Sequence, residues 1–438
     1  MKEIPIPDEV VKTLAKELDI QAPGSSSIRE IANLVDKIEE KTGIKFIRME
    51  MGVPGLPSPS IAIEAEIAAL KKGVAAIYPN ITGVESLKME ISRFIKLFLD
   101  IELDPRGCIP TVGSMMGSMI SFLVANRNDK NNEGTLFIDP GFPVQKQQVK
   151  MLGQNYYSFD VYNYRGKKLK AKLESFLRTG KISSLLFSNP NNPSWICLTE
   201  DELAIIGELS GKYDVIVIED LAYFGMDFRK DYSNPGKSPF QPTIARYTDE
   251  YIMLISSSKI FSYAGQRIGI MAVSDQLFDR SYPDLLRYYS TDKFGHAVIF
   301  GALYGLSAGV THSVQYGFAA LLKAVNDGLY RYRDDVMEYG DKARVMKRMF
   351  LSNNFKIVYD RDLDEPLADG FYFTISYPGM TGSRLIEELL CYGISAISLD
   401  STGSDRNEGL RACVSQVSKE QFDDLEIRLK RFCDDHPV

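Results

Sequence analysis

The chain has 438 residues, 45% of them hydrophobic and 25% charged, and its formal net charge at pH 7 is −7. These values predict a soluble globular protein of two or three domains and argue against nucleic acid or a membrane surface as a partner. Because no apolar run of about eighteen residues occurs and the first ten residues lack a signal-peptide pattern, we expect a cytoplasmic protein with no membrane span.

The chain opens with a helical pattern. Residues 8–43 predict two helices separated by the segment APGSSS. The second helix opens at a capping box formed by Ser27 and Glu30, and Gly43 stands where a C-terminal glycine belongs.

Short apolar segments rich in β-branched residues then alternate with helical stretches from about residue 105 to residue 275. A second capping box, Thr199 with Glu202, opens one of these helices. The alternation predicts an α/β fold with a largely parallel sheet that is buried on both faces. The predicted strands begin near residues 134, 182, 214, 251 and 268.

A long helical region is predicted from about residue 311 to residue 350, and the last ninety residues read as a smaller α+β domain. We therefore expect an N-terminal helical segment over 1–50 that packs on the small domain or on a dimer partner. A large α/β domain over 51–310 follows, and a long linking helix with the small domain covers 311–438.

The numbers and spacing of the cysteines and histidines limit the kinds of site that the chain is expected to form. The five cysteines are scattered and form no C-x-x-C pair, which predicts reduced thiols and neither a disulfide frame nor a zinc site. With only three histidines, a histidine-based metal cluster is not expected, and no metal is predicted.

Polar residues follow three neighbouring predicted strands, where α/β sheets bind ligands. The first strand runs into the turn Asn-Pro-Asn-Asn-Pro at 189–193, the second into Asp220 with Tyr223 three residues later, and the third into Ser256 and Lys259. Taken singly, each has an ordinary interpretation as a turn, a helix cap or a solvated lysine. Together they predict one ligand site.

The glycine patterns of nucleotide-binding loops are missing, but a different anion site is predicted. A short strand leads through Gly113 into a helix that starts near Ser114, so its free N–H groups suit a phosphate. Ser256 and Arg267 can add a hydroxyl and a guanidinium. A lysine beside that anion, with a carboxylate across from it, indicates pyridoxal phosphate held as a Schiff base.

The sequence resembles the class I/II aminotransferases, which are fold-type I enzymes that use pyridoxal 5′-phosphate. The resemblance runs from about residue 45 to residue 430. Its strongest motif is S-x-S-K-x(5)-G-x-R-x-G, which Ser256 to Gly269 match. The other matching segments, in the family's order, are YPNITGVESLK, DPGFP, NPNNP, DLAY and GLRACVS.

The resemblance implies a role for each matching residue. Lys259 forms the Schiff base and then moves the substrate α-proton, while Asp220 keeps the pyridine nitrogen protonated. Tyr78 reaches the phosphate of a neighbouring subunit, which implies a homodimer with shared active sites. The remaining implied contacts are Asn192 and Tyr223 to the phenolic oxygen, Phe142 to the ring face, Gly113, Ser114, Met115, Ser256 and Arg267 to the phosphate, and Arg411 with Asn192 and Gly52 to the substrate.

Several positions depart from the family pattern. Pro193 is followed by Ser194 and Trp195, the only tryptophan, where the family often has Thr-Gly. Ser257 and Tyr263 stand at usually apolar positions, and the small-domain segments LADGFYF and SLDSTGSD replace the usual ones. The resemblance therefore implies the cofactor site without implying the amino donor.

Three functions remain open from the sequence. The first is transfer of an amino group between an L-amino acid and a 2-oxo acid. The second is another reaction on the same scaffold, a C–S β-lyase or a decarboxylase, and the third is a non-catalytic cofactor-binding regulator. Arg287 and Lys293 could supply a second cation for a dicarboxylate substrate, but a solvated helix face is the expected interpretation of both.

Overall fold

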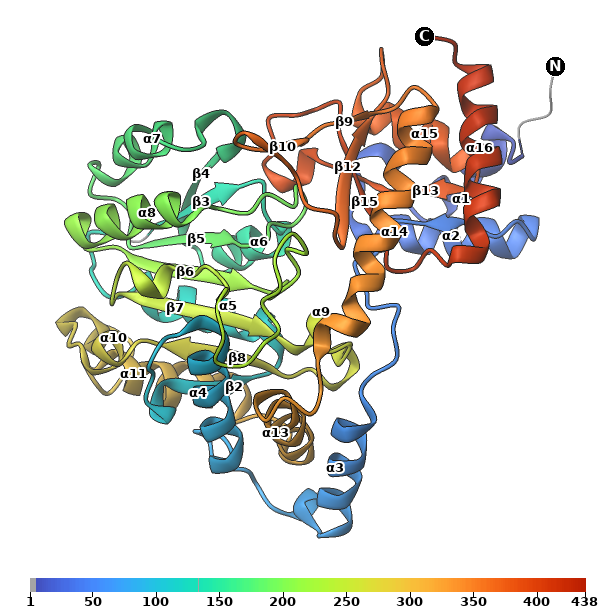
Figure 1. Cartoon of the computed structure of the whole chain (residues 1–438). Helices are drawn as coiled ribbons and strands as arrows, with labels where there is room; N and C mark the ends of the chain where they lie inside the picture. The colour runs from blue at the N-terminus through green and yellow to red at the C-terminus, as the bar shows by residue number, and fades with distance from the viewer. Residues whose placement is uncertain (1–4, 133) are drawn as a thin grey trace. The chain divides into compact units, whose positions relative to one another are not determined.

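The computed structural model describes residues 5–132 and 134–438, which divide into two compact units (Figure 1). The large unit comprises residues 56–191 and 197–336. The small unit comprises residues up to 55, the short segment 192–196 and residues 337–438. The first four residues of the predicted N-terminal segment lie outside the described residues.

A seven-stranded sheet forms the centre of the large unit. Its order is β2-β8-β7-β6-β5-β3-β4, and only β8 runs antiparallel to its neighbours. This mostly parallel sheet confirms the predicted α/β fold class and all five predicted strands. The strands are β2 (Cys108–Thr111), β3 (Gly134–Asp139), β4 (Asn155–Asp160), β5 (Ser184–Ser188), β6 (Ile216–Leu221), β7 (Tyr251–Ser256) and β8 (Gly269–Val273).

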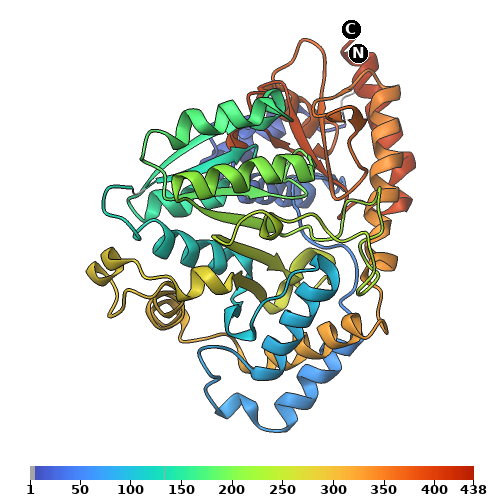
Figure 2. The ribbon, with the colours of Figure 1, turned by 60° about the vertical axis from the view of Figure 1, so that its left-hand side comes forward.

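Helices cover this sheet. Every residue of β6 and β7 is buried, which requires cover on both faces. Figure 2 shows α7 and α8, drawn in green, together on one side of the sheet, while α5 packs on β6, β7 and β8. The helices are α3 (Ser60–Lys71), α4 (Glu85–Leu99), α5 (Gly113–Ala125), α6 (Pro143–Met151), α7 (Lys168–Leu177), α8 (Glu200–Tyr213), α9 (Ser257–Ile260), α10 (Asp275–Asp279), α11 (Phe294–His296), α12 (Tyr304–Ser307) and α13 (His312–Asn326).

The small unit combines an antiparallel sheet with helices from both ends of the chain. The four-stranded sheet has the order β14-β15-β12-β9, and β1 pairs with β13 in parallel. The strands are β1 (Ile47–Arg48), β9 (Lys356–Ile357), β10 (Arg361–Asp362), β11 (Glu365–Pro366), β12 (Tyr372–Ser376), β13 (Ile394–Ser395), β14 (Ile397–Ser398) and β15 (Leu410–Cys413). The helices are α1 (Asp8–Glu17), α2 (Ile28–Thr42), α15 (Gly382–Cys391) and α16 (Phe422–Asp435).

Local signals predicted the helix ends well. Both predicted capping boxes are present, at Ser27 with Glu30 and at Thr199 with Glu202. Gly43 ends α2 in the left-handed conformation, with φ +74°. The helical region predicted over 311–350 consists of two helices, α13 and α14 (Tyr332–Ser352), because the chain turns at Gly328 with φ +71°.

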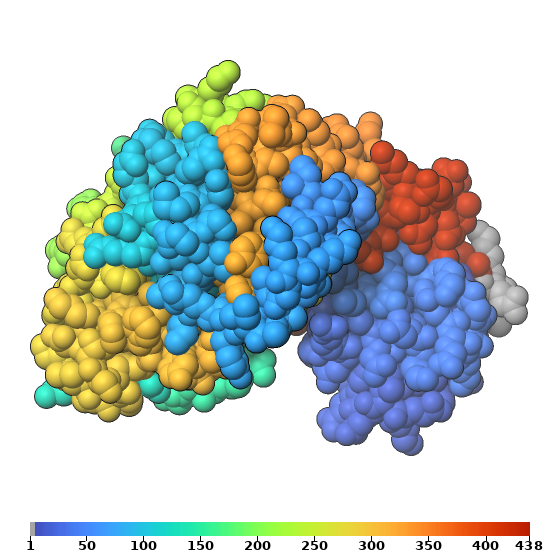
Figure 3. All heavy atoms as spheres, turned by 90° about the horizontal axis from the view of Figure 1, so that it is seen from below, coloured from blue at the N-terminus to red at the C-terminus, as the bar shows by residue number. Residues whose placement is uncertain are grey.

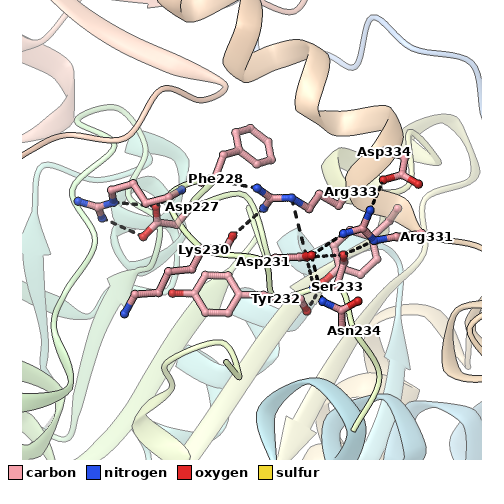
Figure 4. A network of polar contacts seen from close by, with 12 residues as sticks. Asp227, Phe228, Lys230, Asp231, Tyr232, Ser233, Asn234, Arg331, Arg333 and Asp334 are labelled. Carbon is pink, nitrogen blue, oxygen red and sulfur yellow. Dashed lines mark hydrogen bonds and ion pairs between the residues drawn. The ribbon is translucent and has the colours of Figure 1, made fainter. Parts of the chain in front are cut away.

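A polar network ties the start of α14 to the loop that follows β6 (Figure 4). Arg331 forms an ion pair with Asp231 and donates from Nε to Ser233 Oγ over 3.0 Å. Arg333 donates to Lys230 O over 2.6 Å. Partial burial favours a higher pKa for Asp231, but hydrogen bonds from Ser233, Asn234 and Arg331 outweigh it and lower that pKa to about 2.

Candidate functional site

The ends of β6 and β7 carry the first two predicted site residues. Side chains alternate along a strand, so Asp220 shares a face with Ile218, and Ser256 shares a face with Leu254. Ile218 and Leu254 both belong to the buried cluster that includes residues of α5. The sheet therefore directs Asp220 and Ser256 toward the same side, the side on which α5 packs.

Lys259 lies in α9, the single helical turn that follows β7 directly. Ser256 caps this turn, because its Oγ accepts a hydrogen bond from Ser258 N over 3.2 Å. The Lys259 side chain is half-buried. A strand end thus holds the serine and the lysine three residues apart on one rigid turn.

Gly113, Ser114 and Arg267 lie close together at the start of α5. Gly113 has φ +68°, and a Cβ added there would lie 2.6 Å from Arg267 Nη2. On β8, the strand that pairs with β2, a Cβ on Gly269 would lie 2.8 Å from Ser114 N. Both glycines are thus required for the guanidinium and the first N–H groups of α5 to approach this closely. An anion fits such a helix N-terminus, since the N–H groups and the helix dipole both favour negative charge.

Arg267 is held with its guanidinium in place. It adopts the left-handed conformation, with φ +51°, and Nη1 donates to Ala264 O over 2.8 Å. Met115, the third predicted residue of this group, is half-buried, and its carbonyl accepts a hydrogen bond from Gln148 Nε2 over 2.8 Å. The start of α5 is therefore fixed from α6 as well.

Asp220 is a buried carboxylate with two hydrogen-bond donors. Gln145 Nε2 donates to its Oδ2 over 2.8 Å, and Ala222 N donates to its Oδ1 over 3.1 Å. Burial raises the pKa of Asp220 to about 6, and the two hydrogen bonds oppose that rise. A cationic partner would stabilise this carboxylate in its charged form.

Gln145 is a site residue that the sequence did not reveal. It lies in the first turn of α6, three residues after Phe142, which is the half-buried N-cap residue of that helix. No motif marks a glutamine in a helix as the partner of a carboxylate 75 positions away. Only the packing of α6 against α5 and β4 brings the two together.

Tyr223 and Tyr78 differ in exposure. Tyr223 follows β6 and is 4% exposed, whereas Tyr78 is 89% exposed at the end of the turn Val74–Ala76. Within one chain, the structure brings Tyr78 to none of the other predicted site residues of the large unit that it describes.

Arg287 and Lys293 are exposed and donate to Asp284 O and Asp279 O, as expected of a solvated face.

Arg411 and Asn192 come together in the small unit. Arg411 lies in β15, is 3% exposed, and donates from Nη1 to Asn192 Oδ1 over 3.4 Å and from Nη2 to Glu50 O. Its Nε is buried without a hydrogen-bond partner among the described residues. A buried guanidinium with an unused donor is suited to a carboxylate ligand.

Gly52 lies beside the same cluster. A Cβ on Gly52 would lie 2.0 Å from the Tyr372 hydroxyl, and the Tyr372 ring centroid lies 4.7 Å from Arg411 Cζ. Gly52 is therefore a position where a tyrosine of β12 packs directly on backbone. Tyr372 and Glu50 are further members of this cluster that the sequence did not single out.

Two departures from the family pattern have local structural partners. The hydroxyl of Ser257 donates to Ile268 O over 2.6 Å, which ties α9 to the start of β8. The hydroxyl of Tyr263 donates to Glu66 Oε2 in α3 over 2.8 Å. Both polar side chains are buried and paired, so neither disturbs the turn that carries Lys259.

The described residues contain no group of three or more His, Cys, Asp or Glu side chains arranged to hold an ion. No disulfide joins the five cysteines. Within the described part of the chain, no helix is both long and apolar enough to cross a membrane.

Comparison with known proteins identifies the family. Residues 45–425 match the family described as aminotransferase class I and II. The chain is 26% identical over 352 residues to a protein described as a probable aspartate aminotransferase of Methanocaldococcus jannaschii, covering 74% of this chain and 85% of that protein. It is 26% identical over 322 residues to the LL-diaminopimelate aminotransferase of Natranaerobius thermophilus, covering 72% of this chain and 76% of that protein.

Solved structures agree on the fold. An aminotransferase from Mycobacterium tuberculosis superposes with a TM-score of 0.76 at 15% identity, covering 93% of this chain and 96% of that one. The match over most of the chain, together with the α/β fold and the resemblance seen in its motifs, leads to one conclusion: this chain belongs to the class I and II aminotransferases and is an aminotransferase.

Proposed function

We propose that this aminotransferase uses pyridoxal 5′-phosphate and that Lys259 is the residue that bonds to it. The observation that carries this proposal is the position of Lys259 on the turn capped by Ser256, in the same unit as the cradle of Gly113, Ser114 and Arg267. The cradle suits a phosphate, and Asp220 suits a protonated pyridine nitrogen. The donor set therefore fits the cofactor at both of its polar ends.

When bound, the cofactor supplies an aldehyde that captures an amino group and a ring that accepts electrons from the neighbouring carbon. Arg411 binds the substrate α-carboxylate through its guanidinium. The Nζ of Lys259 would take the proton from the substrate α-carbon and deliver it to the carbon on the other side of the amino nitrogen. The carboxylate of Asp220 keeps a proton on the ring nitrogen, which favours electron flow into the ring.

Tyr223 and Asn192 contact the phenolic oxygen in this proposal, and Phe142 stacks on the ring. Asn192 accepts the hydrogen bond from Arg411 through Oδ1, and the Nδ2 amide is its donor group.

We also propose a homodimer with active sites shared through Tyr78. Apolar side chains are exposed along α3 and the turn after it, the face seen in Figure 3: Ile63, Ile67, Leu70, Ile77 and Tyr78 are 41–89% exposed. Tyr304 and Leu306 extend this exposure near α5, because Ser307 lies 3.6 Å from Met116 Sδ. An apolar surface that reaches the edge of the phosphate cradle is suited to a second copy of the chain. A cytoplasmic location agrees with five cysteines that form no disulfide.

The reaction type is tested by half-reactions. The purified enzyme is mixed with single amino acids without an acceptor, and the absorbance of the cofactor is followed. Stoichiometric conversion of the cofactor to its amine form, reversed by a 2-oxo acid, supports transamination. Continuous release of a 2-oxo acid and ammonia without an acceptor would contradict it and indicate a lyase.

A further inference from the structure

The segment 192–196 joins the small unit, although the residues on either side of it belong to the large unit. It carries Asn192, which accepts a hydrogen bond from Arg411, and Trp195, which is the only tryptophan and is 1% exposed. A five-residue segment has little surface with which to hold its position. Burial of the largest side chain in the chain is its strongest hydrophobic contact.

Trp195 is held in a conformation that its residue type disfavours. Its φ is +65°, in the left-handed region that is sterically unfavourable for an L-residue with a side chain. A glycine would adopt the same φ without this cost. Packing of the indole must therefore offset the backbone strain.

The indole has a site shaped for it in the small unit. A Cβ added to Gly370 would lie 2.1 Å from Trp195 Cε2 and 2.3 Å from Trp195 Nε1, so the indole packs directly on the glycine backbone. Its ring also meets the ring of Tyr372 edge-on, with centroids 6.1 Å apart and an interplanar angle of 70°. Any side chain larger than hydrogen at position 370 would displace it.

Tyr372 connects this site with Arg411. Thr374 is the residue that pairs with Arg411 across β12 and β15, and Tyr372 is its neighbour two positions along on the same face. The Tyr372 ring lies 4.7 Å from Arg411 Cζ, within the range of a cation–π contact. Tyr372 and Asn192 therefore both contact Arg411. Trp195 contacts Tyr372 and lies in the same five-residue segment as Asn192.

We propose that Trp195 is a positioning residue for substrate carboxylates: its indole, seated between Gly370 and Tyr372, holds Asn192 and the Tyr372 ring against Arg411. This inference rests on the proposed function, in which Arg411 binds the α-carboxylate. It assigns a task to the tryptophan that stands where the family often has glycine.

The test measures ligand affinity separately from chemistry. Pyruvate, 2-oxoglutarate and phenylpyruvate are titrated into the enzyme with its cofactor in the aldehyde form, which a 2-oxo acid does not convert. The dissociation constant of the tightest of the three is then compared among variants by calorimetry. Trp195→Leu is expected to weaken binding about 3- to 10-fold, the loss expected for one typical hydrogen bond. KM should rise by a similar factor, while kcat changes less than about twofold.

Two further variants separate positioning from stability. Phe355→Leu, in a buried aromatic cluster of the same unit with Phe350, Tyr377 and Phe432, should lower Tm as Trp195→Leu does and leave the dissociation constant unchanged. Trp195→Gly relieves the left-handed strain but removes the indole, so it should weaken binding as the leucine variant does. Wild-type affinity in Trp195→Gly would overturn the inference, because the backbone alone would then position Asn192.

The outcomes also separate this inference from the function on which it rests. If a 2-oxo acid binds the wild type and binds Trp195→Leu equally well, the role of Trp195 is wrong while the proposed function stands. If none of the three binds the wild-type enzyme, the carboxylate site at Arg411 is wrong, and the inference fails with it. Restoration of most of the affinity in Trp195→Phe, which keeps a ring against Tyr372, would support the indole's role.

Discussion

The two predicted binding regions of this aminotransferase are built in different ways. In the large unit, Asp220, Ser256 and Lys259 stand at the ends of adjacent parallel strands, so the sheet itself aligns them. In the small unit, Arg411 is surrounded by residues from separate parts of the chain: Glu50, Asn192 and Tyr372. The first region depends on strand register, and the second depends on packing.

We relate this difference in construction to a division between catalysis in the first region and substrate specificity in the second. A group at a strand end keeps its position as long as the sheet forms, which suits a cofactor whose chemistry must not vary. A cluster of loop and strand residues changes with each side chain that packs around it, which suits the recognition of different substrates. We therefore expect substitutions in the first region to lower turnover and substitutions in the second to lower affinity.

The largest effect is expected from Lys259→Ala. Loss of the group that we propose bonds to the cofactor and moves the α-proton should lower turnover by at least about 10⁴-fold. The visible absorption of the lysine-bound cofactor should disappear from the purified protein. Lys237→Ala, at an exposed lysine of the same unit, serves as the control and should match the wild type. An unchanged spectrum in Lys259→Ala would overturn the assignment.

The next largest effect is expected from Asp220→Asn. An amide cannot hold a proton on the ring nitrogen as a carboxylate does, so turnover should fall about 10²- to 10³-fold. Cofactor should still be retained, because the phosphate cradle is intact, and equilibrium dialysis measures this. Near-wild-type turnover would mean that Asp220 only supports the local turn through Ala222 N.

Arg411→Lys tests the second region. An ammonium cannot bind a carboxylate with two parallel hydrogen bonds, so KM for both substrates should rise about 10- to 100-fold while kcat changes less. Steady-state kinetics with the amino acid found in the half-reaction screen measures the change. Arg384→Lys, at a residue whose side chain is 59% exposed, is the control. A fall in kcat at unchanged KM would place Arg411 with the first region instead.

Tyr78→Phe tests whether the first region is complete in one chain. Loss of one hydroxyl hydrogen bond to the phosphate of a neighbouring subunit should weaken cofactor retention about 3- to 10-fold. The dimer itself should persist, because the exposed apolar side chains of α3 are unchanged. Sedimentation of a wild-type monomer that is fully active at assay dilution would contradict a shared site.

The smallest effect is expected outside both regions, at the ion pair between Asp231 and Arg331. Asp231 has a lower pKa in the folded protein than its usual value, so it stabilises the fold at higher pH, and this stability is lost as pH falls from about 4 toward 2. Asp231→Asn should therefore lower Tm by about 1–2 °C at pH 7, with the difference from wild type shrinking in acid. Asp249→Asn, at an exposed side chain, is the matched control for the loss of one carboxylate.

Much of the fold followed from local rules. The strands at 134, 182, 214, 251 and 268 and both capping boxes are where pattern and residue type predicted them. The break between α13 and α14 was missed, because a glycine within a helical pattern signals a turn only weakly. The partner of Asp220 was missed for a different reason: Gln145 reaches it only because α6 packs against α5 and β4.

The sequence by itself determined the class of chemistry. A lysine, an acid and a glycine that opens a helix stand at the ends of alternating strands, where α/β sheets bind ligands. Only the tertiary structure decided how Arg411 is held. Trp195 gave no periodic signal, and its left-handed backbone, its seat on Gly370 and its contact with Tyr372 arise from residues that are close in space and distant in sequence. Close packing of this kind depends on the shapes of all neighbours at once, which no local pattern specifies.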